Sequence, residues 1–94
     1  MNKTEINKNI INYLVKYNLK KIAIFGSFVR NELNPDSDID ILIDYYKPLT
    51  LLQLVRIERE LTELLGIKVD LITERAVNPD LRKYIEKDLQ IIYP

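Results

Sequence analysis

Residues 25–44 carry the sequence FGSFVRNELNPDSDIDILID, in which closely spaced aspartates run into an apolar segment. Two of them, Asp38 and Asp40, alternate with isoleucines. Alternate side chains of a β-strand share one face, so the pattern predicts a strand that directs its isoleucines into a core and both aspartates to the opposite face. Carboxylates grouped in this way repel one another and cost free energy to desolvate unless a cation neutralises them.

A third carboxylate, Asp70, lies between Val69 and Leu71 in a second apolar run, residues 67–73. If the two strands are neighbours, Asp38, Asp40 and Asp70 converge. The chain has no His and no Cys, so a metal would have to be held by oxygen ligands. Mg²⁺ prefers carboxylate and phosphate oxygens, and a pair of Mg²⁺ ions clamps both oxygens in phosphoryl transfer. We therefore expect a site for two Mg²⁺ ions, with Mn²⁺ as the alternative.

Gly26 and Ser27 follow an apolar strand and precede a predicted short helix at residues 28–33. Backbone N–H groups at such a junction bind anions, and glycine allows a phosphate to approach closely. Ser27 adds a hydroxyl donor. Arg30 is expected to pair with a nearby carboxylate, a role that is compatible with contacting substrate.

Each of these features also has a simpler explanation when it is taken alone. A Gly-Ser pair is most often a plain turn between strand and helix. Asp38 alone is better explained as a turn cap, and Asp40 as a solvent-facing residue of a sheet covered on one side only. Asp70 alone is most often a solvated strand residue, and Asp36 and Asp44 are expected to be solvated. The combination of these features favours a phosphate cradle beside a metal site.

The whole chain indicates one α+β domain, residues 1–94, in which helices pack a small mixed sheet of about four strands. Thr50 and Gln53 match a capping box, and Gly66 stands where a helix C-terminal cap belongs. The intervening helix is expected to bury one apolar face, which consists of Leu54, Ile57, Leu61 and Leu64. The expected helices are 4–18, 28–33, 50–66 and 78–89, and the expected strands are 21–25, 38–46, 67–73 and 90–93.

The composition gives no reason to expect a nucleic-acid or membrane partner. Lys+Arg 14 and Asp+Glu 14 balance to a net charge of zero, whereas nucleic-acid-binding domains usually carry a basic excess. No apolar run approaches the roughly 20 residues that span a bilayer. The first residues, MNKTEINKNI, lack the apolar core of a signal peptide, so a cytoplasmic location is expected.

Together these residues resemble the nucleotidyltransferase superfamily of DNA polymerase β, whose signature is Gly-Ser, a fixed gap, Asp-x-Asp and a third carboxylate on a later strand. The minimal nucleotidyltransferases, a small stand-alone branch, commonly carry GS-x-x-R-G…SDIDLLV, and this chain has GSFVRN…SDIDILI. Asn31 departs from the pattern, because the family often has Gly there. The resemblance implies the polymerase β-like nucleotidyltransferase fold and, since all three carboxylates are present, an active enzyme.

The resemblance also implies roles for individual residues. Asp38 and Asp40 would bind the Mg²⁺ ions, and Asp70 would complete the first metal site and help to deprotonate the attacking hydroxyl. Gly26 and Ser27 would hold the triphosphate of ATP, and Arg30 is placed with them as a nucleotide-binding residue. The hydroxyl would attack the α-phosphate, and pyrophosphate would leave.

Members of this branch are typically paired with a small helical HEPN protein, a ribonuclease-type toxin. The resemblance therefore implies an antitoxin that transfers AMP from ATP to a hydroxyl of its cognate HEPN toxin, and a tyrosine is the expected residue. Two alternatives stay open: a non-catalytic antitoxin that neutralises the toxin by direct binding, and a small-molecule nucleotidyltransferase of the aminoglycoside type. The intact carboxylates favour the first function, and the expected lack of an acceptor-binding domain counts against the last.

Overall fold

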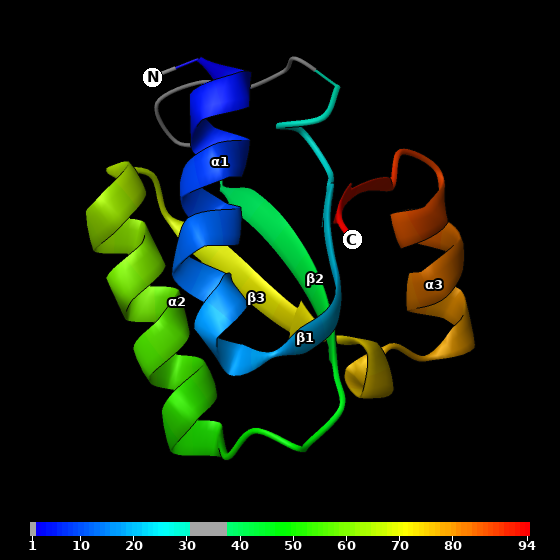
Figure 1. Cartoon of the computed structure of the whole chain (residues 1–94). Coiled ribbons are helices and arrows are strands. Elements are labelled where there is room, and N and C mark those ends of the chain that lie inside the picture. Colours follow the sequence, from blue (N-terminus) through cyan, green and yellow to red (C-terminus); the bar gives the residue numbers. More distant parts are fainter. Residues whose placement is uncertain (1, 31–37) are drawn as a thin grey trace.

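Three helices and four strands make up the part of the chain that the computed structural model describes, residues 2–30 and 38–94 (Figure 1). Single turns of 3₁₀ helix lie at Val15–Tyr17 and Glu74–Ala76. The main elements are, in chain order, α1 (Lys3–Leu14), β1 (Leu19–Phe25), β2 (Ile39–Tyr45), α2 (Leu51–Leu65), β3 (Val69–Thr73), α3 (Pro79–Glu86) and β4 (Gln90–Tyr93).

The four strands form one sheet in the order β3-β2-β1-β4. β1 runs antiparallel to both β2 and β4, whereas β2 and β3 are parallel. Helices α1 and α2 cover one face of this sheet and α3 covers the other (Figure 1). The predicted α+β fold with a mixed four-stranded sheet is confirmed.

The two faces of β2 explain why aspartates and isoleucines alternate along it. Ile39, Ile41 and Ile43 are fully buried beneath α1 and α2. On the opposite face, Leu42 packs with Ile85 of α3 in a second, smaller core. The face that carries the aspartates is therefore covered in part by a helix, and the sheet is not open to solvent on that side as the simpler explanation required.

The sequence signals for the two ends of α2 are confirmed. Thr50 and Gln53 form a reciprocal capping box at the start of α2, and Gly66 ends that helix with a φ of 69°. The side chain of Asn78 accepts a hydrogen bond from the Leu81 N–H at the start of α3, where Pro79 is the first residue. These caps satisfy backbone groups that a helix end otherwise leaves without partners.

Two expectations about the helices are corrected. α1 ends at Leu14, because a 3₁₀ turn follows and Asn18 adopts a left-handed conformation with a φ of 54°. On α2, Leu64 is exposed and Leu65 is buried in its place. The buried residues Ile57, Leu61 and Leu65 repeat every four positions, which keeps them on one side of the helix.

The predicted short helix at 28–33 lies only partly within the described residues. Residues 27–30 form a turn, in which the N–H groups of Val29 and Arg30 donate to the Gly26 carbonyl at 3.1 and 3.3 Å. The rest of that predicted helix and the residues Asn31 and Asp36 lie outside the described residues.

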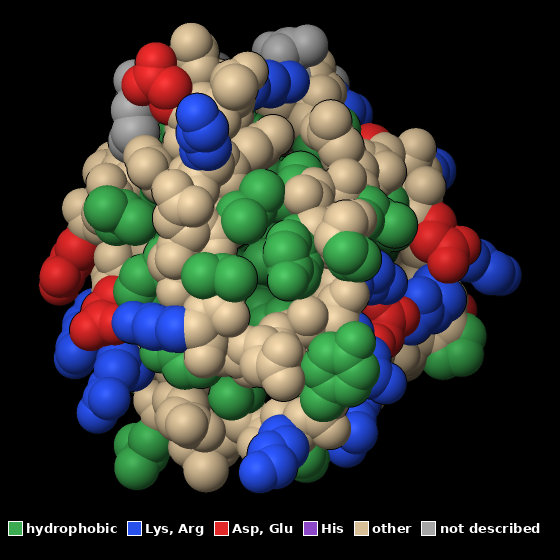
Figure 2. Space-filling model, viewed as in Figure 1, with side chains coloured by type: hydrophobic (Ala, Val, Ile, Leu, Met, Phe, Trp, Pro, Cys, Tyr) green, Lys and Arg blue, Asp and Glu red, His purple; other side chains and the backbone are tan. Residues whose placement is uncertain are grey.

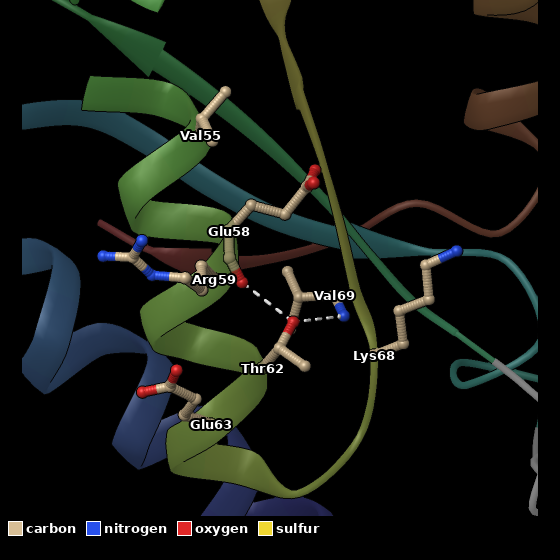
Figure 3. Close-up of a pocket in the computed structure, with 7 residues that line it drawn as sticks. All are labelled: Val55, Glu58, Arg59, Thr62, Glu63, Lys68 and Val69. Atoms are coloured by element: carbon tan, nitrogen blue, oxygen red, sulfur yellow. Dashed lines mark hydrogen bonds between the residues drawn. The ribbon is translucent and has the colours of Figure 1, made fainter. Parts of the chain in front are cut away.

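β3 is an edge strand, and α2 supplies partners for its outward backbone groups. The Val69 N–H donates to Oγ1 of Thr62 at 3.0 Å, and the Leu71 N–H donates to Oε2 of Glu58 at 2.9 Å. Oγ1 of Thr62 in turn donates to the Glu58 carbonyl at 2.8 Å (Figure 3). These side chains occupy backbone N–H groups of an edge strand that could otherwise pair with another strand.

The surface carries charges of both signs. Figure 2 shows Lys, Arg, Asp and Glu side chains interspersed around the rim of one face, with hydrophobic side chains gathered toward its centre. Within residues 2–30 and 38–94, none of the helices has the length and apolar character needed to cross a membrane.

We expect Thr62→Val to lower the free energy of unfolding by about 1–3 kcal/mol, because valine keeps the shape of threonine but leaves the Val69 N–H without its acceptor. Chemical denaturation would measure the change. Thr4→Val is the matched control, since Thr4 is an exposed threonine on α1. Equal stability of the Thr62 and Thr4 variants would show that the bond to the edge strand contributes nothing.

Candidate active site

Gly26 is the point at which β1 leaves the sheet. Its φ is +82°, a backbone conformation that L side chains rarely adopt. A Cβ at this position would overlap Oδ2 of Asp40 and lie 3.3 Å from the Asp40 Cγ. Glycine is therefore required twice, once by the backbone angle and once by the close approach of a carboxylate. The turn predicted to hold phosphate and the predicted metal ligand Asp40 are in direct contact.

Asp40 and Asp70 lie side by side on the parallel strands β2 and β3, as register partners. Asp40 is half-buried, whereas Asp70 is exposed. Asp38 immediately precedes β2, and one of its carboxylate oxygens lies 3.8 Å from Nζ of Lys68. The strand pairing that the sequence left open thus brings Asp70 next to Asp40.

The acidic groups around Asp40 are only partly neutralised. The pKa of Asp40 is raised to about 6, first by burial of the carboxyl and then by the neighbouring carboxylates of Asp70, Asp38 and Asp88. The guanidinium of Arg30 acts in the opposite direction, but it is the weakest of these influences. The surroundings of this half-buried carboxyl therefore disfavour its ionised form unless further positive charge is present.

Among the residues that the structure describes, no group of three Asp, Glu, His or Cys side chains is arranged to hold a metal ion. The chemistry of the donor set nevertheless fits a hard divalent cation, because Asp38, Asp40 and Asp70 offer only oxygen atoms and carry excess negative charge. The neighbouring carboxylates add to the effect of burial in raising the pKa of Asp40. These three residues are therefore the ones that could hold Mg²⁺ or Mn²⁺.

Ser27 and Arg30 lie in the turn that starts at Gly26. Ser27 is half-buried, and Arg30 is exposed and forms an ion pair with Asp88. The expectation that Arg30 pairs with a carboxylate is confirmed. The Gly26 N–H donates to the other Asp88 oxygen at 3.1 Å, so this donor, which was expected to face a phosphate, has a protein partner instead.

Sequence reasoning missed two residues that hold this turn. Asp88 lies between α3 and β4, far from Gly26 in sequence, and no spacing rule connects the two. Burial raises the pKa of Asp88, but its bonds to the Gly26 N–H and to Arg30 outweigh this and leave the pKa below the ordinary value. Lys3 of α1 donates to the Val29 carbonyl at 3.2 Å. No sequence pattern singled out Asp88: the expected helix 78–89 included this residue, whereas α3 ends at Glu86.

Comparison with known proteins places the chain in a family. A family model described as a nucleotidyltransferase domain matches residues 7–92. "Putative protein adenylyltransferase MJ1217" of Methanocaldococcus jannaschii is 59% identical over 75 residues, which cover 79% of this chain and 76% of that protein. "Protein adenylyltransferase MntA" of Thermococcus cleftensis is 34% identical over 74 residues, which cover 79% of this chain and 75% of the relative.

Solved structures share the fold. A crystal structure of a toxin-antitoxin with AMP-PNP matches with a TM-score of 0.84 at 24% identity, covering 93% of this chain and 72% of that one. A re-refined structure of a tri-AMPylated Shewanella oneidensis HEPN toxin in complex with MNT antitoxin matches with a TM-score of 0.79 at 22% identity, covering 96% of this chain and 71% of that one. At these identities the likeness concerns the fold.

We expect Gly26→Ala to destabilise the protein more than Gly66→Ala. Both glycines have a positive φ, which costs an alanine roughly 1–2 kcal/mol. Nothing lies within 4 Å of a Cβ at Gly66, whereas at Gly26 the overlap with Asp40 adds roughly 1–3 kcal/mol. Urea denaturation would compare the two variants. The difference should disappear when Asp40 is also replaced by alanine, and its persistence there would rule out the Asp40 contact as its cause.

Without divalent metal, we expect Asp40→Asn to be more stable than wild type at pH 7.5, by on the order of 1 kcal/mol because solvent screens a half-buried group. Because the folded-state pKa of Asp40 is raised to about 6, its ionised carboxylate destabilises the folded state above that pH. This destabilisation is lost below pH 3.8, where the carboxyl is protonated in the folded and the unfolded state. The advantage should therefore shrink between pH 6 and pH 4. Urea denaturation in EDTA measures it, with Asp44→Asn as the control on the same strand. An advantage independent of pH would contradict this explanation.

Proposed function

Because the chain belongs to the nucleotidyltransferase domain family, we propose that it transfers AMP from ATP to a hydroxyl group of a HEPN-type toxin protein and thereby acts as the antitoxin of that toxin. The observation that carries this proposal is the contact between the Gly26 turn and the Asp40 carboxyl. A turn that carries the Ser27 hydroxyl and the Arg30 guanidinium beside a carboxylate cluster suits phosphoryl transfer, since its catalysis rests on positioning and on neutralising charge.

The metal belongs to this proposal. Asp38, Asp40 and Asp70 would hold Mg²⁺, or Mn²⁺ in its place, and two ions are expected. When bound, the metal supplies positive charge that offsets the negative charge of the carboxylates and the triphosphate. The excess of carboxylates around Asp40 supports this assignment, because the ionised form of that side chain needs a positive neighbour.

The chain's own residues would divide the remaining work. Ser27 and Arg30 bind the triphosphate, with the hydroxyl and the guanidinium as donors. The acceptor hydroxyl oxygen forms a bond to the α-phosphorus, the bond from that phosphorus to the bridging oxygen breaks, and pyrophosphate leaves. Asp70 is assigned to take the hydroxyl proton, because it is the exposed member of the carboxylate pair and lies next to Asp40.

A protein is the acceptor that the surface favours. The first turns of α2 expose Leu51, Leu52 and Val55, with exposed fractions of 76%, 82% and 55%. Apolar side chains grouped on a surface are typical of protein contacts. The net charge of zero speaks against a polynucleotide. The acceptor protein is proposed to be a toxin. This is supported by the names of the adenylyltransferase relatives and by the AMPylated toxin in one structure of the same fold.

The modified residue is proposed to be a tyrosine near the ribonuclease site of the toxin. AMP on a tyrosine adds bulk and negative charge. Both would hinder the approach of an RNA backbone, the first by occlusion and the second by repulsion.

We expect the HEPN-type protein encoded by the neighbouring gene to gain the mass of one or more AMP units after incubation with this chain, ATP and Mg²⁺. Intact-mass spectrometry would measure the gain. The gain should be absent without Mg²⁺ and absent with the Asp38→Asn/Asp40→Asn double variant, because both lack the charge balance that the transfer needs. Peptide mapping should place the added mass on a tyrosine.

The control variant is Asp44→Asn, which removes a carboxylate from the same strand outside the cluster. Toxicity in cells then separates enzymatic silencing from neutralisation by binding alone. If the folded double variant still protects cells fully, and the toxin never gains mass with wild type, the enzymatic proposal fails and direct binding replaces it.

A further inference from the structure

The Gly26–Arg30 turn is fixed at both ends by a single side chain from the other end of the protein. Oδ1 of Asp88 accepts the Gly26 N–H at 3.1 Å, and Oδ2 pairs with the guanidinium of Arg30. The Asp88 side chain is only 12% exposed, so it is set into the protein rather than extended into solvent. A carboxylate that accepts both a backbone N–H and a guanidinium makes charge-assisted hydrogen bonds, which are the stronger class.

These bonds restrain residues that have unusual freedom. Gly26 has no side chain to limit its backbone angles, and glycine loses more conformational entropy on ordering than any other residue. Arg30 carries a long side chain and is exposed. Lys3 restrains the middle of the turn at the Val29 carbonyl, and Asp88 bonds to both Gly26 and Arg30.

We propose that Asp88 is a positioning residue for nucleotide transfer, which holds the Gly26 turn in shape and aims the Arg30 guanidinium at the phosphates of the bound nucleotide. The inference rests on the proposed function in taking ATP as the substrate. It also assigns the Gly26 N–H to Asp88, so phosphate recognition depends on Ser27 and Arg30. Asp88 itself touches neither phosphate nor acceptor.

NMR spectroscopy can test directly whether Asp88 holds the Gly26 turn in shape. It contains only two glycines, Gly26 and Gly66, so selective ¹⁵N-glycine labelling yields two amide signals. In Asp88→Ala the Gly26 signal should shift and exchange faster with solvent, because its acceptor is gone. In Asp88→Asn the acceptor oxygen remains, and the Gly26 signal should stay protected. The Gly66 N–H bonds within its own helix end to the Thr62 carbonyl at 2.9 Å, so its signal serves as the internal control.

Nucleotide affinity tests whether Asp88 aims Arg30 at the phosphates, with AMP-PNP and Mg²⁺ as the probe in isothermal titration calorimetry. Asp88→Ala should weaken binding about tenfold, as expected for the loss of charge-assisted bonds. Asp88→Asn should weaken it less. Asp80→Asn, an exposed aspartate in the first turn of α3, should bind like wild type. A double-mutant cycle with Arg30→Gln should be non-additive, so that Asp88→Asn adds little once Arg30 is gone.

The outcomes separate this inference from the proposed function. If wild type binds AMP-PNP with Mg²⁺ but the Asp88 variants bind equally well, or the losses at Asp88 and Arg30 simply multiply, the positioning role is wrong and the proposed function stands. If wild type does not bind the nucleotide, the proposed function fails and the inference fails with it. Should Asp88→Ala not fold, Asp88→Asn and the cycle decide the question.

Discussion

The close approach of Gly26 to the Asp40 carboxyl is the constraint on which the arrangement of the site depends. Strand β1 must end, turn and leave the sheet while a half-buried carboxylate occupies the space where a side chain would stand. Only glycine meets both demands, because it adopts the positive φ and leaves room for Oδ2. The Gly26 turn and the acidic cluster are consequently built as one unit, not as two sites that happen to be near each other.

Charge balance is the second constraint. The carboxylates of Asp38, Asp70 and Asp88 all act on Asp40, and among the described residues Arg30 and Lys68 lie close enough to offset part of this negative charge. Asp88 has a lowered pKa because the Gly26 N–H and Arg30 stabilise its charge, whereas Asp40 has a raised one. The protein thus pairs the Asp88 carboxylate with its own groups, whereas burial and the neighbouring carboxylates disfavour the ionised form of Asp40.

The sheet and its three helices hold these groups in place. A single sheet is covered by α1 and α2 on one face and by α3 on the other, so β2 carries isoleucines toward one core and Asp40 beside Leu42 toward the second. The exposed edge of β3, which carries Asp70, is secured by Glu58 and Thr62 of α2. Asp70 is therefore exposed, but it lies on a strand whose backbone is held in place.

By itself, the sequence determined the elements and the candidate residues, because these depend on local chemistry. Period-two alternation predicted that Asp38 and Asp40 share a face, and Thr50 and Gly66 marked the ends of α2, since capping acts over a few residues. Only the tertiary structure decided that Asp70 stands beside Asp40 and that Asp88 holds Gly26. Strand order and contacts between distant residues arise from packing the whole sheet against its helices, and no local pattern encodes which strand becomes the neighbour of which.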